Sequence, residues 1–491
     1  MNIAEAKQEI INTLRAYTAK DEEGNYKIPI QYQRPVLLMG PPGIGKTAIM
    51  KQIAEEEKIG LVEYTLTHHT RQSAVGLPIL EKKRFQGEEY TVTEYTMSEM
   101  LASVYECIEK EGAETGILFL DEINCVSETL APTMLQLLQN KTFGAHRLPK
   151  GWCIVAAGNP ERYNKSVREF DIVTLDRVKK IEIQENHSVW DRYAARQGVH
   201  LGIRSYLQLR TENFYRIEER QEGSCFVTAR GWEDLSRILQ SYEEMKVPVT
   251  KELIGEYVQH EEVAADFYGF YKLFKSYEEK YQRYSFEEKA DMLFHADFDG
   301  KVLLMQLLEG ELEGKIKEYQ QEKAYINGLY EELKKMKKAV VEEQQDIDTL
   351  FCQTIERRKR QEKILAEQGL FSKEKQKTDK NITKWLDERK WKLKEAGFAA
   401  VKEDFYRETL KLKHQEEQIR MLLDKELGDV KNSSKTGQEL PLFLSMLSQN
   451  EKIAEFITEH RCESYLKESK ALLLQEREAA LKEEIQAFQT N

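Results

Sequence analysis

Closely spaced cysteine pairs, long apolar runs and an excess of basic residues are all missing from this sequence, and each absence argues against a class of protein. The six cysteines are scattered and form no C-x-x-C pair, which argues against a disulfide framework and indicates reduced structural thiols. No apolar run approaches the roughly 18 residues that a membrane-spanning helix needs. The opening residues MNIAEAKQEI lack the basic and then apolar pattern of a signal peptide. We therefore expect a cytoplasmic protein with no membrane segment.

The charge balance narrows the class further. The 491 residues carry a net charge of −12, with 32% charged and 41% hydrophobic residues. This length suits about two to four domains, and the acidic excess argues against a dedicated nucleic-acid-binding protein. The pair His68-His69 has no partner at the spacing of a metal site, so we expect a structural role in the second strand or a role in the insert rather than zinc binding.

A phosphate-binding pattern is the most informative feature that is present. Residues 40–47 read GPPGIGKT and fit G-x-x-x-x-G-K-[ST], between a predicted buried strand at 36–39 and a predicted helix at 48–57. Glycines let the backbone curl so that its N–H groups converge on an anion at the helix N-terminus. Lys46 can reach the outer phosphates, and Thr47 places a hydroxyl where Mg²⁺ would lie. A nucleoside-triphosphate site is therefore predicted, and in this context a Gly/Pro-rich turn that matches by chance is the weaker interpretation.

Two further predicted strands each end in polar residues. Residues 117–120 form an apolar run that delivers Asp121 and Glu122, and residues 153–157 form another that is followed by Asn159. Ligands of open α/β sheets bind at the carboxyl ends of the strands, so these side chains should meet the phosphates. Asp121 would hold Mg²⁺ through its water shell, and Glu122 would orient and deprotonate the attacking water. Asn159 would place its amide between that water and the γ-phosphate.

Two arginines follow these strands along the chain. Arg177 precedes a predicted edge strand at 178–183, far from its own phosphates but able to reach those of a neighbouring subunit. Arg230 begins an amphipathic helix, where it could report whether a γ-phosphate is bound. Taken alone, each is the kind of arginine that forms surface salt bridges. Their position after the other motifs favours the functional interpretation.

The ordered series GPPGIGKT, ILFLDEIN, AAGNP, LDR and TARGWEDL resembles AAA+ ATPases, and specifically the MoxR-like branch, over about residues 30–245. The resemblance implies a P-loop AAA+ parallel-sheet domain with a helical lid that binds ATP and Mg²⁺. It implies nucleotide binding by Gly40, Pro41, Pro42, Gly43, Ile44, Gly45, Lys46, Thr47 and Ala48, and metal binding by Thr47 and Asp121. It implies catalytic roles for Glu122 (Walker B), Asn159 (sensor 1), Arg177 (arginine finger) and Arg230 (sensor 2).

The chain departs from the family pattern in two places. Val178 stands where the family usually has Phe after the finger arginine, and Arg168 is a competing finger. Ala229 stands where a Pro often precedes the sensor 2 arginine. Residues 69–97 lie between the second strand and the Walker B motif and resemble the helix-2 insert, which in that branch projects toward the central pore. A hairpin is predicted there, with its turn near Phe85-Gln86-Gly87.

The second half of the sequence has a different composition. No proline occurs between Pro248 and Pro441, and Glu, Lys, Gln and Leu dominate this stretch, which predicts long helices. A heptad of apolar residues predicts a coiled-coil-like seam. It consists of Leu312, Tyr319, Ile326, Leu333, Val340 and Ile347, beside a second row of Ile316, Leu329 or Tyr330, Met336, and Leu350 or Phe351. We expect the chain to turn back near 369–372, with Trp385, Leu393, Val401 and Phe405 on the facing helix. A long dimeric coiled coil and an ordinary helical bundle are the alternatives.

The expected domain order is therefore an α/β nucleotide-binding domain followed by a long all-α, partly coiled-coil-like region. Its parts are a sheet domain at 1–185, a lid at 186–245, a connector at 246–310, an arm at 311–430, and a linker with a final helical segment at 431–491. Family resemblance suggests a homo-oligomeric ring, most often a hexamer. In such a ring the protein would remodel or activate a protein client, with a von Willebrand factor A (VWA) domain protein as partner. A nucleic-acid motor or GTP-dependent restriction-type subunit is the rival interpretation, and an ATP-gated scaffold is a third.

Overall fold

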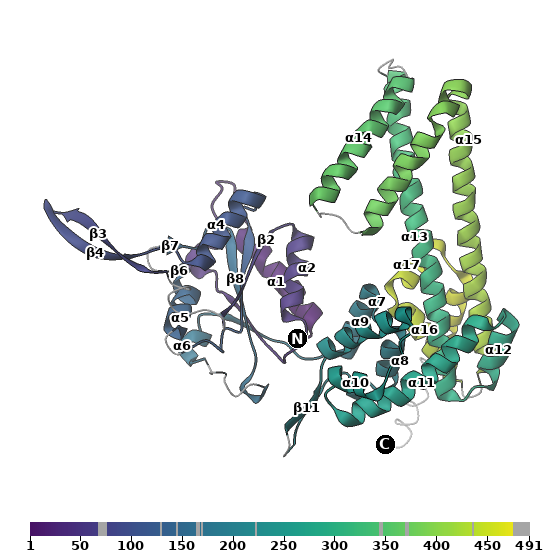
Figure 1. The fold of residues 1–491 in the computed structure, drawn as a ribbon, viewed down its shortest axis with the longest axis horizontal. Coiled ribbons are helices and arrows are strands. Elements are labelled where there is room, and N and C mark those ends of the chain that lie inside the picture. Colours follow the sequence, from purple (N-terminus) through teal and green to yellow (C-terminus); the bar gives the residue numbers. More distant parts are fainter. Residues whose placement is uncertain are drawn as a thin grey trace, which may run out of the picture. The chain divides into compact units, whose positions relative to one another are not determined.

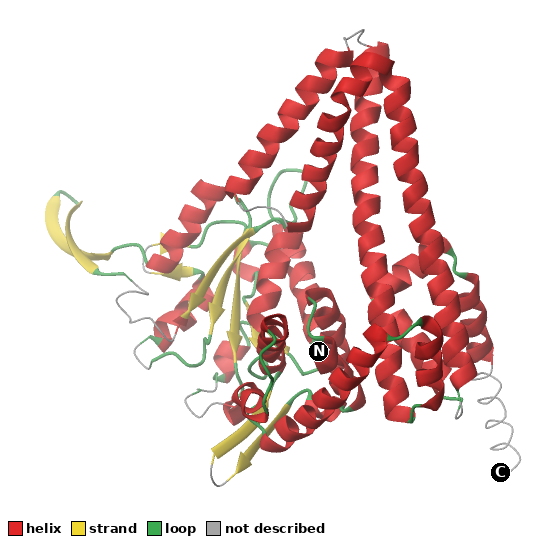
Figure 2. Ribbon diagram, turned by 45° about the vertical axis from the view of Figure 1, so that its right-hand side comes forward, coloured by secondary structure: helices red, strands yellow, loops and turns green. Residues whose placement is uncertain are grey.

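The computed structural model describes residues 1–66, 76–127, 130–143, 146–163, 167, 170–220, 223–342, 347–368, 373–434 and 437–474. The chain divides into two compact units, Met1–Tyr271 and Lys272–Asn491. The first contains a parallel sheet and the second is helical (Figures 1 and 2), which confirms the predicted fold class. None of the described helices combines the length and the apolar character needed to cross a bilayer. The cysteines form no disulfide within the described residues.

A five-stranded parallel sheet is the framework of the first unit. Its strands lie in the order β2-β5-β8-β1-β9. Their bounds are β1 Val36–Met39, β2 Gly60–Thr65, β5 Gly116–Asp121, β8 Trp152–Gly158 and β9 Lys179–Glu182. The three strands predicted from apolar runs are confirmed, and β9 lies at one edge of the sheet, as expected. Strands β5 and β8 are buried almost throughout, which explains why their sequences read as unbroken apolar runs.

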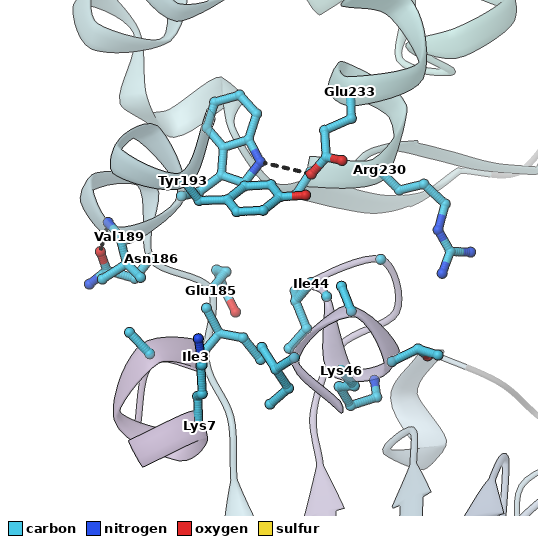
Figure 3. A pocket seen from close by; sticks show the side chains of 18 of the residues that line it. Ile3, Lys7, Ile44, Lys46, Glu185, Asn186, Val189, Tyr193, Arg230 and Glu233 are labelled. Atoms are coloured by element: carbon cyan, nitrogen blue, oxygen red, sulfur yellow. Dashed lines mark hydrogen bonds between the residues drawn. The ribbon is translucent and has the colours of Figure 1, made fainter. Parts of the chain in front are cut away.

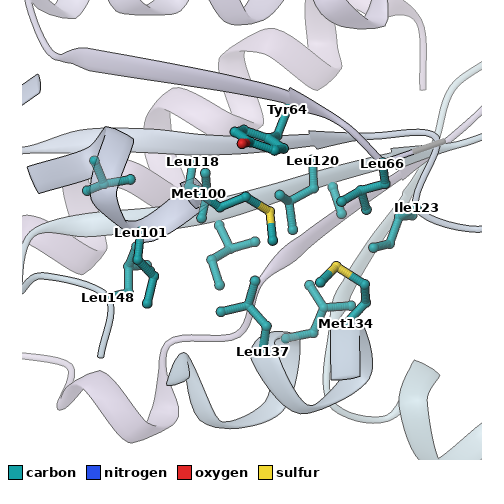
Figure 4. Packing of buried hydrophobic residues seen from close by; sticks show 14 of the residues in the cluster. Tyr64, Leu66, Met100, Leu101, Leu118, Leu120, Ile123, Met134, Leu137 and Leu148 are labelled. Carbon is teal, nitrogen blue, oxygen red and sulfur yellow. The ribbon is translucent and has the colours of Figure 1, made fainter. Parts of the chain in front are cut away.

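Alternate residues of these strands bury against helices on opposite faces. Phe119 of β5 packs in one cluster with α1 (Ile3–Thr18) and α2 (Lys46–Glu57). Leu118 and Leu120 of the same strand pack in a second cluster with α4 (Glu99–Glu111) and α5 (Ala131–Asn140), as Figure 4 shows. Both faces of the sheet are therefore covered, which leaves its strand ends as the open place for a ligand.

The expected hairpin is present between β2 and α4. Strands β3 (Pro78–Phe85) and β4 (Glu88–Tyr95) pair antiparallel across Gln86 and Gly87, whose φ angles of 52° and 92° suit a two-residue turn. Most of its side chains are exposed. The start of the expected insert, residues 69–75, lies outside the described residues. Shorter elements complete the sheet region: β6 Thr142–Phe143, β7 His146–Arg147 and α6 Ile172–Leu175, with 3-10 turns at Ile30–Tyr32 and Glu161–Tyr163.

A helical subdomain with its own core follows β9. Its core joins aromatic residues far apart in the chain, including Trp190, Tyr206, Trp232, Phe267 and Tyr271. The core therefore continues past residue 245, where the sequence placed the end of the lid. The elements are α7 His187–Gln197, α8 Leu201–Leu209, a 3-10 turn Thr211–Asn213, β10 Arg216–Arg220, β11 Gly223–Val227, α9 Ala229–Met245, α10 Lys251–Tyr257 and the first part of α11, Glu261–Arg283.

The second unit is built from helices of very unequal length. They are α12 Phe286–His295, α13 Phe298–Glu342, α14 Ile347–Gln368, α15 Lys373–Ser433, α16 Glu439–Gln449 and α17 Glu451–His460. The N-terminal half of α13 packs against α16 and α17, and the ring of Tyr319 meets that of Phe456 edge-on at 5.6 Å between centroids. A buried ion pair of 3.0 Å between Lys301 and Glu439 also joins α13 to α16.

The predicted seam is buried along the described part of α13. Leu312, Tyr319, Ile326 and Leu333 are each at most 7% exposed, and Leu329 rather than Tyr330 continues the second row. The seam packs within the chain, because Leu329, Leu333 and Met336 share a cluster with Phe351, Trp385 and Val401. The side chains of Val340, Ile347 and Leu393 lie outside the described residues, as does the expected turn at 369–372.

A further chain reversal occurs inside α15. Gly397 has a φ of 71°, and Arg389 on one side of it bonds Asp404 on the other at 3.2 Å. The two parts of α15 therefore run antiparallel, and Figures 1 and 2 show them beside α13 and α14. Arg358 of α14 ties this group together, because it contacts both Glu332 of α13 and Asp379 of α15. The arm thus consists of four helical segments, two more than the simple hairpin favoured by the sequence.

Candidate functional site

The strand order places the predicted polar residues at one edge of the sheet. Strand β8 lies between β1 and β5, and all of these strands run parallel. The segments that follow them therefore emerge side by side, which brings the loop after β1 next to Asn159, and Asn159 next to Asp121. This neighbourhood was expected from the sequence, but the identity of the middle strand was not.

The loop after β1 depends on glycine at defined positions. Gly43 and Gly45 have φ angles of 72° and 94°, in the left-handed region that other residues rarely adopt, and Gly45 caps α2. Gly40 is needed for space, because a Cβ there would lie 2.9 Å from the carbonyl oxygen of Ile183. The loop thus ends at the start of a helix that has no side-chain cap, and a helix N-terminus of this kind can bind phosphate through its N–H groups.

Lys46 is buried at the centre of the loop. Its Nζ donates to the carbonyl oxygens of Gly40 and Pro41 and to Oδ1 of Asn159, each at 2.8 Å. Burial lowers the pKa of Lys46 to about 8, while the negative charge of Asp121 opposes the decrease and the positive charge of Arg230 adds to it. An anion that approaches this ammonium group would favour its charged form.

Thr47 and Asp121 supply an oxygen-rich pair. The hydroxyl of Thr47 donates to Oδ2 of Asp121 at 2.8 Å, and the backbone N–H of Glu122 donates to Oδ1 at 2.9 Å. Hydroxyl and carboxylate oxygens are the ligands that Mg²⁺ takes beside phosphates, so these residues fit that ion. Glu122 itself has a φ of 57°, an unusual backbone conformation for a residue with a side chain, and such outliers gather at functional sites.

A cavity of about 700 Å³ lies over these groups in the first unit. Pro42, Gly43, Ile44, Gly45, Lys46, Thr47 and Ala48 line it, together with Asp121, Glu122, Asn159 and Arg230. Gly40 and Pro41 are the predicted binding residues that do not line it, and they instead hold Lys46. The structure therefore brings together all the predicted site residues except the finger arginines.

The lid closes over the loop through direct contacts. The hydroxyl of Tyr215 donates to the carbonyl oxygen of Pro42 at 3.0 Å, and a Cβ at Gly43 would lie 3.0 Å from Oγ1 of Thr228, the residue that caps α9. Arg230 follows in the first turn of α9, on the wall opposite Lys46 in Figure 3. The sequence missed Tyr215, because nothing around it signals phosphate binding.

The far part of the cavity has apolar and aromatic walls. Ile3 and Val189 line it with Trp190 and Tyr193 of α7, and the Trp190 Nε1–H donates to Glu233 at 3.4 Å (Figure 3). Burial raises the pKa of Glu233 above its usual range. Charged side chains, among them Lys7, Arg192 and Arg196, also line the cavity. Apolar and aromatic walls beside polar groups suit a nucleobase and its sugar. None of these residues was predicted, because they belong to α1 and the lid and carry no motif of their own.

The two candidate fingers are not part of this cavity. Arg177 follows α6 and is exposed, and it is not among the described residues that line the cavity. Arg168 lies outside the described residues.

The comparison with protein families agrees with this geometry. Residues 36–176 match the family described as ATPase family associated with various cellular activities (AAA). This segment is similar to AAA ATPases. The match runs from β1 to the residue before Arg177 and includes Lys46, Asp121, Glu122 and Asn159, so it supports nucleotide binding and ATP hydrolysis. No curated protein matches the chain.

Proposed function

We propose that this protein binds ATP with Mg²⁺ and hydrolyses its γ-phosphate. The observation that carries the proposal is the hydrogen-bonded group of Lys46, Asn159, Thr47 and Asp121, at the open edge of the sheet beneath a cavity of about 700 Å³. These four residues come from three segments that the sequence identified separately: the loop at 40–47, the end of β5 and the residues after β8. Such convergence of phosphate-binding, metal-binding and polar groups defines a reaction class of phosphoryl transfer to water.

Nucleotide binding is assigned to the loop, and metal binding to the side-chain oxygens of Thr47 and Asp121. The loop N–H groups and Lys46 would hold the outer phosphates, and the aromatic end of the cavity would take the base. Thr47 and Asp121 would hold Mg²⁺, which neutralises phosphate charge when bound. Because the direct partners of Lys46 are two carbonyls and an amide, its positive charge remains available to the phosphates.

Catalysis is assigned to groups on both sides of the cavity. Glu122 would orient the attacking water and accept its proton, and Asn159 would hold that water against the γ-phosphate. Arg230 would contact the γ-phosphate from the lid. Arg177 would reach the phosphates of a neighbouring subunit, with Arg168 as the alternative, and the exposure of Arg177 supports this role.

A shared site of this kind requires a ring, and a hexamer of the MoxR-like branch is our specific proposal. The ring would remodel a protein client, with a VWA-domain protein as partner. The exposed hairpin β3–β4 supports a role in contacting other proteins, because exposed apolar side chains such as Leu80 and Phe85 line it.

Two variants test the proposed chemistry by separating binding from hydrolysis. We expect Lys46→Ala to lose ATP binding, because the outer phosphates lose their main charge partner. Glu122→Gln should still bind ATP but release no phosphate, since Thr47 and Asp121 are intact and only the base is gone. A fluorescent ATP analogue measures binding and phosphate release measures turnover, with GTP run in parallel.

The matched control is Lys110→Ala, which removes an exposed lysine on α4. This variant should bind and hydrolyse ATP like the parent protein. Equal loss of ATP affinity in Lys46→Ala and Glu122→Gln would contradict the assigned roles.

A further inference from the structure

Asn124 makes a two-point contact with the backbone of Asn159. The Asn124 side chain is 3% exposed. Its Nδ2 donates to the carbonyl oxygen of Asn159 at 2.7 Å, and its Oδ1 accepts from the backbone N–H of Asn159 at 3.3 Å. Both backbone groups of one residue are therefore held by a single amide side chain, which fixes the position and the orientation of Asn159.

The neighbouring glycine makes this contact possible. A Cβ on Gly158 would lie 2.6 Å from Oδ1 of Asn124, closer than any real contact permits. Gly158 is the last residue of β8 and does not have a positive φ, so no conformational demand explains the glycine. Space for the Asn124 amide does explain it.

The contact joins two groups that the proposed reaction needs. Asn124 lies in the turn that starts with Glu122, closed by a bond of 2.9 Å from the Cys125 N–H to the Glu122 carbonyl. On the other side, Asn159 accepts from Lys46 through Oδ1, which leaves its amide N–H groups as the donors for a phosphate oxygen or a water molecule. A displacement of Asn159 would therefore misplace those donors relative to Glu122.

We propose that Asn124 is a positioning residue for ATP hydrolysis, which holds Asn159 at a fixed position relative to Glu122. The inference rests on the proposed ATPase function. Asn124 acts through Asn159 and does not itself line the cavity. Misplacement by a fraction of an ångström affects the reacting geometry more than it affects ATP binding, because the loop and the base pocket stay intact.

Three variants test the proposal. Asn124→Ala removes the two hydrogen bonds between Asn124 and the Asn159 backbone, which we call the clamp. Gly158→Ala displaces the clamp while every polar group is kept. We expect both to lower kcat for ATP by about tenfold or more, with KM changed by less than about threefold. The matched control Asn140→Ala removes an exposed amide at the end of α5 and should behave like the parent protein.

Hydrogen exchange without nucleotide gives a second readout that does not depend on activity. The Asn159 amide should exchange faster in Asn124→Ala and Gly158→Ala than in the control, because its acceptor is lost or moved. If the parent hydrolyses ATP, unchanged exchange or an unchanged kcat in the two variants would overturn this proposal and leave the proposed ATPase function intact. Parallel losses of kcat, ATP affinity and melting temperature would also overturn it, in favour of a merely structural role. A parent protein without ATPase activity would overturn the proposed function as well.

Discussion

Lys46 of the first unit and Lys301 of the second are both buried, and their direct hydrogen-bond partners differ. In the first unit, the direct acceptors of Lys46 are two backbone carbonyls and the Asn159 amide, none of them anionic. In the second unit, Lys301 contacts the carboxylate of Glu439 at 3.0 Å and the Ser433 carbonyl at 2.6 Å. The first ammonium group can still bind an anion, whereas the second already has its counter-ion. The surroundings of Lys46 thus indicate a ligand site, whereas those of Lys301 indicate a structural joint.

The contrast extends to what surrounds each lysine. Around Lys46 the chain places a cavity of about 700 Å³ and side chains from the ends of three strands. Around Lys301 it places helices α13, α15 and α16, and the pair is 2% and 1% exposed. Variants in the second unit should therefore change stability without changing nucleotide chemistry, and the predictions below test this separation.

The largest effect is expected from the apolar seam of the arm. Replacing Leu329, Leu333 and Met336 together with Asn should unfold the arm locally, because each change removes a buried contact worth about 1.5–3 kcal/mol. Circular dichroism and limited proteolysis measure the loss, and basal ATPase activity should persist. The control replaces the exposed residues Glu331, Lys334 and Lys337 of the same helix with Asn. Identical proteolysis of the two triple variants would show that the seam does not stabilise the arm.

The next effect concerns the one proposed catalytic group outside the cavity. Arg177→Ala should leave ATP affinity nearly intact and lower turnover by about 10³-fold or more, since a finger arginine is worth 10³–10⁵ in related systems. Mixing this variant with Lys46→Ala should restore part of the activity, because an intact phosphate site then meets an intact Arg177. Arg283→Ala, an exposed arginine of α11, is the control. No recovery, with subunit exchange confirmed, would favour Arg168 or an action within one subunit.

Breaking the structural joint should have a smaller but still large effect. Lys301→Met removes the ammonium partner of the buried Glu439 carboxylate and should lower the stability of the second unit by about 3–5 kcal/mol. The double variant Lys301→Met/Glu439→Leu should recover much of this loss, because both buried charges of the pair are then replaced by apolar side chains. Denaturant unfolding followed by circular dichroism measures both, and ATP binding should be unchanged. A loss of ATP affinity in Lys301→Met would show that nucleotide binding depends on the stability of the second unit.

The smallest effect is expected at Glu426 of α15. This carboxyl is 2% exposed, and neither of its oxygens has a hydrogen-bond partner in the described structure. Burial raises the pKa of Glu426 well above its usual range, and the charge of Glu311 on α13 adds to this, whereas Lys289 and Lys315 oppose it. A raised folded-state pKa stabilises the fold at low pH, and this stabilisation is lost as the pH rises through that pKa.

The melting temperature of Glu426→Gln should therefore fall less than that of the parent when the pH rises from about 6 to 9. At the alkaline end of this range the variant should melt at a higher temperature than the parent. Glu417→Gln, an exposed carboxyl on the same helix, should retain the pH dependence of the parent. Thermal melts over this pH range provide the measurement. Parallel curves for Glu426→Gln and the parent would mean that Glu426 is not the titrating group.

Much of the first unit could be predicted from local sequence. The loop at 40–47 and the strands ending at Asp121 and Asn159 are contiguous patterns, and parallel strands present their carboxyl ends at one edge. The arm was predicted less completely. Its seam follows from the heptad, but the reversal at Gly397 was missed, because the helical composition continues unbroken on both sides of that glycine.

The sequence by itself determined which groups we propose for phosphate chemistry, because a glycine-rich loop and strand-end carboxylates are recognisable from neighbouring residues alone. Only the tertiary structure decided what holds those groups and what covers them. The clamp of Asn124 on Asn159 joins residues 35 positions apart, and the contact of Tyr215 with Pro42 joins residues 173 positions apart. Such contacts depend on strand order and lid packing, which arise from side chains distant in the chain and leave no local pattern to read.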